Sequence, residues 1–319
     1  MLGMELHDPL PSGGARLSLN DAPASCRLCP RGCAVSRLDG DLGYCGAGIL
    51  ASVNVSQLHF GEEPPISGRR GSGAVFFSGC TLNCCYCQNH RISRGHEGSR
   101  QMDARGLAEL FLDLEGKGAH NINLVSPTPY TAVIGQALTI AREGGLSLPT
   151  VYNTSGYEKI DTLRALAGFI DIYLPDYKYS DPLKAGKLSG AADYPQAARA
   201  AIGEMLAQVG HLQMDEQGIA RRGLMVRHLV LPDGMSDTPR ALRDIVRICG
   251  KGIYISLMAQ YTPLYKVALT PGLDRPLKRE EYAAALKAAE DLGIYNGFIQ
   301  DPSAAGQEMI PDFNSEDNL

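Results

Sequence analysis

Short apolar segments alternate with amphipathic helical segments over most of this 319-residue chain. An apolar run of a few residues indicates a buried strand, whereas apolar residues at three- and four-residue spacing indicate a helix. Strands and helices in strict alternation favour a parallel β/α architecture, because parallel strands need long crossover connections. The six expected strands cover residues 74–78, 121–126, 150–154, 170–174, 224–231 and 252–258.

The segments between these strands carry helical spacing and recognisable ends. An apolar stripe over residues 107–114 follows Asp103, which is a candidate N-cap. Further helices are expected over residues 198–209, 238–249 and 279–292. The count of six strand–helix units falls short of the eight that close a complete TIM barrel.

Composition limits the function classes that fit this chain. The 44% hydrophobic content supports a substantial core, and we expect a tail (1–25), a cysteine-rich module (26–65), one large domain (70–300) and a second tail (301–319). The net charge of −5, without a Lys/Arg run, does not favour a nucleic-acid partner. The chain shows neither a secretory signal nor an apolar run of the roughly 20 residues that span a bilayer, so we expect a cytoplasmic protein without membrane contact.

Eight of the nine cysteines fall into two groups, which in a cytosolic chain indicates metal ligation rather than disulfides. Cys80, Cys84 and Cys87 directly follow the strand at 74–78. Three thiolates at this spacing can bind three corners of one iron–sulfur cluster and leave one iron open for chemistry. Cys85 breaks the spacing and is expected to be no ligand. A zinc knuckle or a stray thiol cluster is the alternative.

The Cys80-x3-Cys84-x2-Cys87 spacing, with Tyr86 before the last cysteine, resembles the signature of the radical S-adenosylmethionine (SAM) superfamily. The resemblance implies a partial (β/α)6 TIM-like barrel and a [4Fe–4S] cluster whose free iron chelates the amino and carboxylate groups of SAM. It also implies reductive cleavage of SAM to methionine and a 5′-deoxyadenosyl radical, with electrons from a flavodoxin- or ferredoxin-type donor. Tyr86 is expected to meet the adenine of SAM.

Polar residues follow the expected strands, where parallel β/α proteins place their sites. Because neighbours in a strand point to opposite faces, only one of Arg227 and His228 can face the site, and we expect His228 to pack in the core. The chain lacks the Gly-Gly-Glu stretch that many superfamily members carry after the second strand. The candidate SAM-binding residues at the strand ends are Ser126, Thr128, Asn153, Ser155, Asp176, Lys178, Arg227 and Gln260.

Two of these strand ends suggest a subfamily. Asp176-x-Lys178 and the run from Arg227 to Pro232 resemble the activating enzymes of glycyl-radical proteins such as pyruvate formate-lyase. Together with the cysteine patterns, they resemble most closely a group of pyruvate formate-lyase activating-enzyme-like iron–sulfur proteins. The implied reaction is hydrogen abstraction, with the Cα of a glycine in a partner protein as one candidate substrate. The alternatives are radical modification of a small molecule or another peptide, and a non-catalytic iron–sulfur electron carrier.

The second cysteine group comprises Cys26, Cys29, Cys33 and Cys45. Four thiolates make a closed site that suits zinc or a fully ligated iron–sulfur cluster, so a structural or electron-relay role is expected. The spacing does not separate zinc from iron, and a pair of disulfides is the third reading. The Pro- and Gly-containing segment 62–68 is expected to link this module to the main domain.

Overall fold

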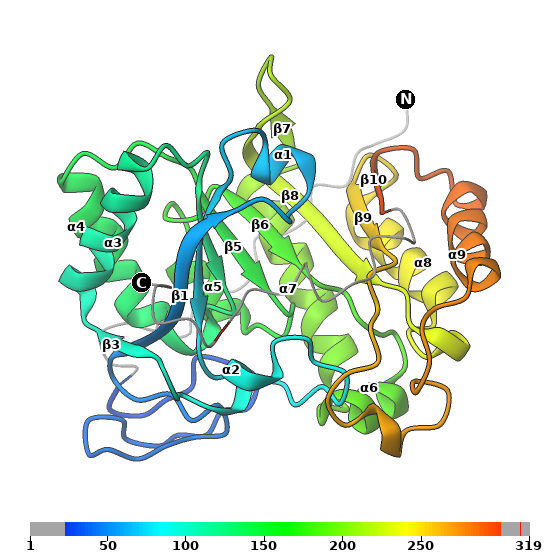
Figure 1. Ribbon diagram of the computed structural model, residues 1–319, viewed down its shortest axis with the longest axis horizontal. Coiled ribbons are helices and arrows are strands. Elements are labelled where there is room, and N and C mark those ends of the chain that lie inside the picture. The colour runs from blue at the N-terminus through cyan, green and yellow to red at the C-terminus, as the bar shows by residue number, and fades with distance from the viewer. Residues whose placement is uncertain (1–22, 301–312, 314–319) are drawn as a thin grey trace, which may run out of the picture.

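The computed structural model describes residues 23–300 and Phe313 (Figure 1). Most of the expected N-terminal tail (1–25) and all of the expected C-terminal tail (301–319) except Phe313 lie outside these residues. No helix of the described part is both long and apolar enough to span a membrane.

Six parallel strands form the centre of a single large sheet, and they follow one another across the sheet in chain order. Each overlaps one strand expected from the sequence, so the prediction of an α/β fold with a large parallel sheet is confirmed. Within the described residues the sheet does not close into a barrel, and β10 and β3 are its two edge strands. The six strands are β2 (Ser72–Phe77), β4 (Ile122–Val125), β5 (Thr150–Thr154), β6 (Ile172–Pro175), β8 (Ala220–Leu229) and β9 (Tyr254–Met258).

Four further strands were not expected from the sequence. β1 (Ala51–His59) pairs antiparallel with β2, and β3 (Arg100–Met102) pairs antiparallel with β1. β10 (Gly297–Ile299) runs parallel beside β9, and the short β7 (Gln213–Met214) pairs with β8. β1 lies inside the range 26–65 that the sequence assigned to the cysteine module, yet it is a strand of the main sheet.

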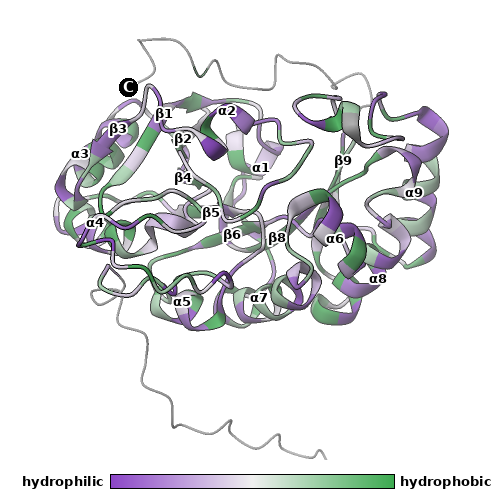
Figure 2. Cartoon of the chain, turned by 90° about the horizontal axis from the view of Figure 1, so that it is seen from below, coloured by the Kyte–Doolittle hydropathy of each residue, from purple (hydrophilic) through white to green (hydrophobic). Residues whose placement is uncertain are grey.

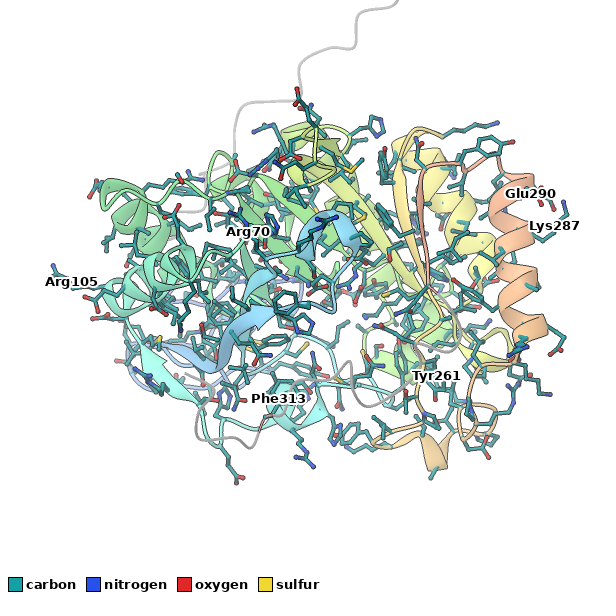
Figure 3. The ribbon with its side chains drawn as sticks, turned by 45° about the horizontal axis from the view of Figure 1, so that its top comes forward. Arg70, Arg105, Tyr261, Lys287, Glu290 and Phe313 are labelled. Carbon is teal, nitrogen blue, oxygen red and sulfur yellow. The ribbon has the colours of Figure 1, made fainter. Side chains whose placement is uncertain are left out.

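The helices that connect the parallel strands cover the outer, convex side of the sheet, which curves into a U in Figure 2. Asp103 caps α3 as expected, because its Oδ1 accepts a hydrogen bond of 2.8 Å from the backbone N–H of Gly106. The outer face of α9 carries Lys287 and Glu290, which project away from the sheet in Figure 3. These helices are α3 (Ala104–Gly116), α4 (Thr131–Glu143), α5 (Ile160–Ala165), α7 (Tyr194–Val209), α8 (Thr238–Cys249) and α9 (Arg279–Asp291), whereas α6 (Pro182–Ser189) lies near the C-terminal ends of the strands.

The inner face of the sheet is closed at one end and open at the other. Ile66 of the short helix α1 (Pro64–Ser67) is fully buried in a cluster with Val151, Ile172 and Leu174. This packing fills the inner face at the N-terminal ends of the strands. The C-terminal ends point to the lower half of Figure 1, where α2 (His90–Arg94), α6 and the loops of residues 23–50 gather. Short 3-10 turns cover Thr128–Tyr130, Pro232–Gly234 and Val267–Leu269.

Candidate functional site

A cavity of about 210 Å³ lies at the C-terminal ends of the parallel strands, the edge where β/α proteins bind their ligands. Apolar side chains of Phe76, Ile92 and Val125 form part of its wall. Nearly all residues that the sequence predicts for the three-cysteine cluster and for SAM binding also face it. These residues are Cys80, Cys84, Tyr86, Cys87, Ser126, Asn153, Ser155, Asp176, Lys178, Arg227 and Gln260.

Thr128 is the exception, and its expected role in SAM binding is not supported by its position. It does not line this cavity but sits in the turn after β4, 3% exposed, where its hydroxyl donates to Glu158 Oε1 at 2.5 Å. Burial raises the pKa of Glu158 to about 7, although hydrogen bonds from Thr128 and Thr154 oppose the shift. The turn therefore directs Thr128 toward a buried carboxyl group.

The loop that carries the three-cysteine motif rests on the C-terminal end of α6. The backbone N–H groups of Asn83 and Cys85 donate to the carbonyl oxygens of Ser189 and Leu188, at 3.0 and 2.8 Å. These carbonyls are among those that a helix leaves unpaired at its C-terminus. The helix thus fixes the loop so that Cys84 faces the cavity.

Polar groups surround the sulfur atoms of the motif. Ser189 Oγ lies 3.0 Å from Cys84 Sγ, and the backbone N–H of Leu82 donates to Cys80 Sγ at 3.4 Å. Burial raises the pKa of Cys80 to about 11 and that of Cys87 to about 12. Thiolates at these positions therefore need a nearby cation such as an iron ion, and the donors around them suit that state.

Cys85 differs from its neighbours in the motif. It does not line the cavity, and its Sγ lies 4.0 Å from the hydroxyl of Thr270 on the far side of the loop. Its side chain therefore points away from the space that Cys84 faces. This placement agrees with the expectation that Cys85 is no ligand.

Asp176 and Lys178 form an ion pair within the cavity wall, with Lys178 Nζ 2.6 Å from Asp176 Oδ2. Burial favours a neutral amine, but the charges of Asp176 and Cys84 outweigh it and hold the pKa of Lys178 above its usual range. Lys178 therefore stays cationic beside the cysteines. Tyr177 between them faces the opposite side, as strand alternation requires.

Arg227 is engaged by two acidic residues that sequence reasoning missed. Its Nη2 donates to Glu62 Oε2 at 2.8 Å and its Nε donates to Glu63 Oε1 at 2.9 Å. Both carboxylate side chains are only 6% exposed. Glu62 also lines the cavity and accepts hydrogen bonds from the side-chain amides of Asn123 and Asn153.

This arrangement changes the expected role of Arg227. Burial lowers the pKa of a guanidinium, yet Glu63 and Glu62 hold the pKa of Arg227 above its ordinary value. Its remaining donor, Nη1, points to Asn153 Oδ1 at 3.4 Å. The primary partners of Arg227 are therefore protein carboxylates, and it positions Glu62 and Asn153 in the cavity wall.

The neighbour of Arg227 packs on the other face, as expected from strand alternation. His228 is fully buried, with Nδ1 2.6 Å from the carbonyl oxygen of Tyr177 and Nε2 2.9 Å from Thr238 Oγ1. Burial lowers the pKa of His228 to about 4, so the ring is neutral at pH 7. A neutral ring can donate to the carbonyl and accept from the hydroxyl.

Tyr86 lies in the cavity wall, and its hydroxyl group is already hydrogen-bonded. The hydroxyl bonds to the hydroxyl of Tyr179, which in turn lies 2.9 Å from Ser189 Oγ. Only 5% of Tyr86 is exposed, and its ring packs edge-on against Tyr261, with 6.3 Å between the ring centroids. The ring therefore offers a limited surface toward the cavity.

The four N-terminal cysteines surround a second, much smaller pocket. Cys26, Cys29, Cys33 and Cys45 all line it, and about 10 Å³ is open between them. No disulfide joins any of them. In residues 23–300 and Phe313, no three His, Cys, Asp or Glu side chains converge closely enough to hold a single metal ion.

Comparison with known proteins shows distant relatives. No protein-family model matches the chain. It is 26% identical to the uncharacterized protein MJ0674 of Methanocaldococcus jannaschii over 279 residues, which cover 85% of this chain and 75% of that protein.

Two solved structures are also similar to the chain. HydG, a maturase of the [FeFe]-hydrogenase, matches with 13% identity and a TM-score of 0.49, over 72% of this chain and 52% of that one. Streptococcus suis SuiB, bound to the precursor peptide SuiA, matches with 16% identity and a TM-score of 0.47, over 70% of this chain and 46% of that one. The chain thus spans about half the length of each. These matches assign no activity to it.

Proposed function

We propose that the protein is a radical SAM enzyme that abstracts a hydrogen atom from its substrate. The observation that carries this proposal is the position of Cys80, Cys84 and Cys87. All three come from one loop and line the cavity into which the polar strand ends also project. A three-thiolate cluster beside a small-molecule site suits catalysis, because its open iron can bind a ligand.

The donor set fits a [4Fe–4S] cluster held by these three cysteines. The backbone N–H of Leu82 and the hydroxyl of Ser189 are within bonding distance of Cys80 and Cys84, and the Lys178 cation lies in the same wall. The chemistry that the bound cluster supplies is the one-electron cleavage of SAM to methionine and a 5′-deoxyadenosyl radical.

The residues of the chain provide recognition and protection around that chemistry. Asn153, Ser155 and Asp176 place polar groups at neighbouring strand ends, where the amino, carboxylate and ribose groups of SAM need partners. Phe76 and Ile92 line the same cavity with apolar surface, which keeps water from the radical.

The candidate substrates are an extended peptide that presents a glycine Cα, as in activation of a glycyl-radical protein, and another peptide or a small molecule. The cavity volume of about 210 Å³ lies below the range of roughly 300–1,000 Å³ that is usual for small-molecule sites and does not discriminate among these substrates.

A pure electron carrier is the competing function. A carrier needs no charged side chains around a ligand cavity, whereas here Asp176, Lys178 and the Glu62–Arg227 pair all face one. This observation favours an enzyme.

The decisive experiment is anoxic reconstitution with iron and sulfide, followed by reduction with dithionite in the presence of SAM. We expect release of 5′-deoxyadenosine and methionine from the wild type and from the Cys85→Ala control, and none from Cys80→Ala, Cys84→Ala or Cys87→Ala. Reduction and reoxidation without consumption of SAM would instead identify an electron carrier.

A second measurement addresses the substrate. Peptides with glycine deuterated at Cα are added to the reduced enzyme, and deuterium in 5′-deoxyadenosine is measured by mass spectrometry. Transfer of deuterium would support abstraction from glycine. Turnover of SAM without transfer would direct the search to other positions or to small molecules.

A further inference from the structure

We propose that Cys26, Cys29, Cys33 and Cys45 bind an iron–sulfur cluster that passes electrons to the three-cysteine cavity. This inference rests on the proposed radical SAM function, because the cleavage of SAM is the reaction that would use the electrons. The presence of the cluster can be tested without that function.

Two guanidinium groups line the four-cysteine pocket together with the thiols: that of the buried Arg37 and that of the half-buried Arg31, which also lies over the ring of Tyr44. Arg37 is 7% exposed, and its Nη2 lies 3.8 Å from Cys45 Sγ. Its Nε is buried and has no hydrogen-bond partner. Arg31 likewise has a buried Nη2 without a partner. These orphaned donors point to an anionic group that belongs in the pocket.

The two arginines of this pocket have no acidic partner in the described part of the chain, where no carboxylate forms an ion pair with Arg31 or Arg37. Four thiolates around one zinc ion or one [4Fe–4S]²⁺ core carry a net charge of about −2, which would balance the two arginines.

The four thiols suit either zinc or a cluster, because thiolates bind both metals. The open space is only about 10 Å³, so cluster binding requires the loops to spread, and the exposed Cys33 offers that freedom. The position of the pocket beside the three-cysteine cavity is what favours a cluster, because a zinc ion has no redox chemistry to supply there.

The four-cysteine pocket shares a wall with the catalytic cavity. Thr81 lines the pocket, while Cys80 and Leu82 on either side of it line the cavity. The Nε of Arg31 donates to the carbonyl oxygen of Thr81 at 2.9 Å. The two sites are therefore separated by little more than one segment of main chain.

Gly79 shows how closely the two cysteine loops approach. It has a φ of +85°, and a Cβ at this position would lie 2.7 Å from the carbonyl oxygen of Cys45. Only glycine combines this backbone conformation with this contact. Such proximity suits transfer of single electrons between two clusters.

The proposed step moves one electron and no atoms. A reduced one-electron donor of the flavodoxin or ferredoxin type reduces the four-cysteine cluster and is itself oxidised. The same electron then passes to the catalytic site, where it cleaves the sulfonium of SAM. A zinc ion cannot perform this step, because it has no redox chemistry.

Metal content and spectroscopy test the cluster independently of catalysis. The Cys80→Ala/Cys84→Ala/Cys87→Ala triple variant should retain about four irons and four sulfides per chain and show a [4Fe–4S]⁺ electron paramagnetic resonance signal on reduction. SAM should not alter that signal. One zinc per chain and no iron in this variant would overturn the proposal.

Arg37 provides a test that does not remove a ligand. In the triple-variant background, Arg37→Gln should lower the midpoint potential of the remaining cluster, because a nearby positive charge stabilises the reduced form. Arg37→Lys, which keeps the charge, is the matched control. Equal potentials in both would contradict the contact of Arg37 with the site.

The electron-relay role is tested by changing the reductant. With a flavodoxin-type donor, Cys29→Ser and Cys45→Ser should cleave SAM about tenfold or more slowly than the wild type. With dithionite, which is small enough to reach the catalytic site directly, they should keep most of the rate. An equal loss of the SAM-cleavage rate with both reductants, or an unchanged rate with both, would contradict the relay. If the wild type cleaves no SAM at all, the proposed function fails while the cluster measurements still stand.

Discussion

Removal of the Arg227 guanidinium should lower the free energy of unfolding more than removal of one partner of an exposed ion pair does. In Arg227→Met the carboxylates of Glu62 and Glu63, each 6% exposed, lose the one cationic partner that they have among residues 23–300 and Phe313. Breaking a buried pair by removal of one charge costs about 3–5 kcal/mol, because the other charge stays buried. For a protein of this size about 2 °C of melting temperature corresponds to 1 kcal/mol, so we expect a decrease of about 6–10 °C.

Thermal unfolding monitored by circular dichroism measures this effect, with Arg164→Met as the matched control. Arg164 pairs with Glu204 but its side chain is 55% exposed, so its loss should change the melting temperature by no more than about 2 °C. Addition of Glu62→Gln and Glu63→Gln to Arg227→Met should restore most of the stability, because no uncompensated charge remains. Equal melting temperatures for Arg227→Met and Arg164→Met would refute the reasoning.

Three further predictions concern single side chains. Cys84→Ala should bind less iron per chain than Cys85→Ala, because only Cys84 faces the cavity; equal iron contents would contradict the motif assignment. Between pH 6.5 and pH 4 the unfolded chain takes up a proton at His228 that the folded protein, with its pKa of about 4, does not. Stability should therefore fall by up to about 3 kcal/mol as the pH decreases through this window, and His228→Gln should flatten the profile in urea unfolding. Ser189→Ala should lower the midpoint potential of the cluster that we propose at Cys80, Cys84 and Cys87, because it removes a hydrogen bond to Cys84 Sγ; an unchanged redox titration would exclude that contact.

Strand periodicity predicted which residues at the strand ends face the cavity. Because alternate residues of a strand share a face, Asn153 and Ser155 could be assigned together, and both line the cavity. The same rule separated Arg227 from His228, which the structure places on opposite faces. Thr128 does not face the cavity, because periodicity ends with the strand and the turn that follows β4 directs its hydroxyl to Glu158.

The largest omission was the segment that carries Glu62 and Glu63. Its prolines and glycines are typical of a linker, and nothing local indicates that its acidic residues meet Arg227. One signal was available: two adjacent carboxylates before a Pro-initiated helical turn. β1 was also missed, although Ala51 to Ser56 alternates small or apolar residues with polar ones, which is the pattern of a strand with one face on the core.

The Glu62–Arg227 contact also determines when the site can be completed during synthesis of the chain. The hydrogen bonds of Arg227 to Glu62 and Glu63 join residues that are 165 and 164 positions apart. The strands from β2 to β6 pair with neighbours that are close in the sequence, so each can add to the sheet as it emerges. Glu62 and Glu63 precede all of them, yet they remain without their cation until β8 has been made and docked. The wall of the cavity is therefore finished late in folding, by the pairing of an early segment with one of the last strands of the sheet.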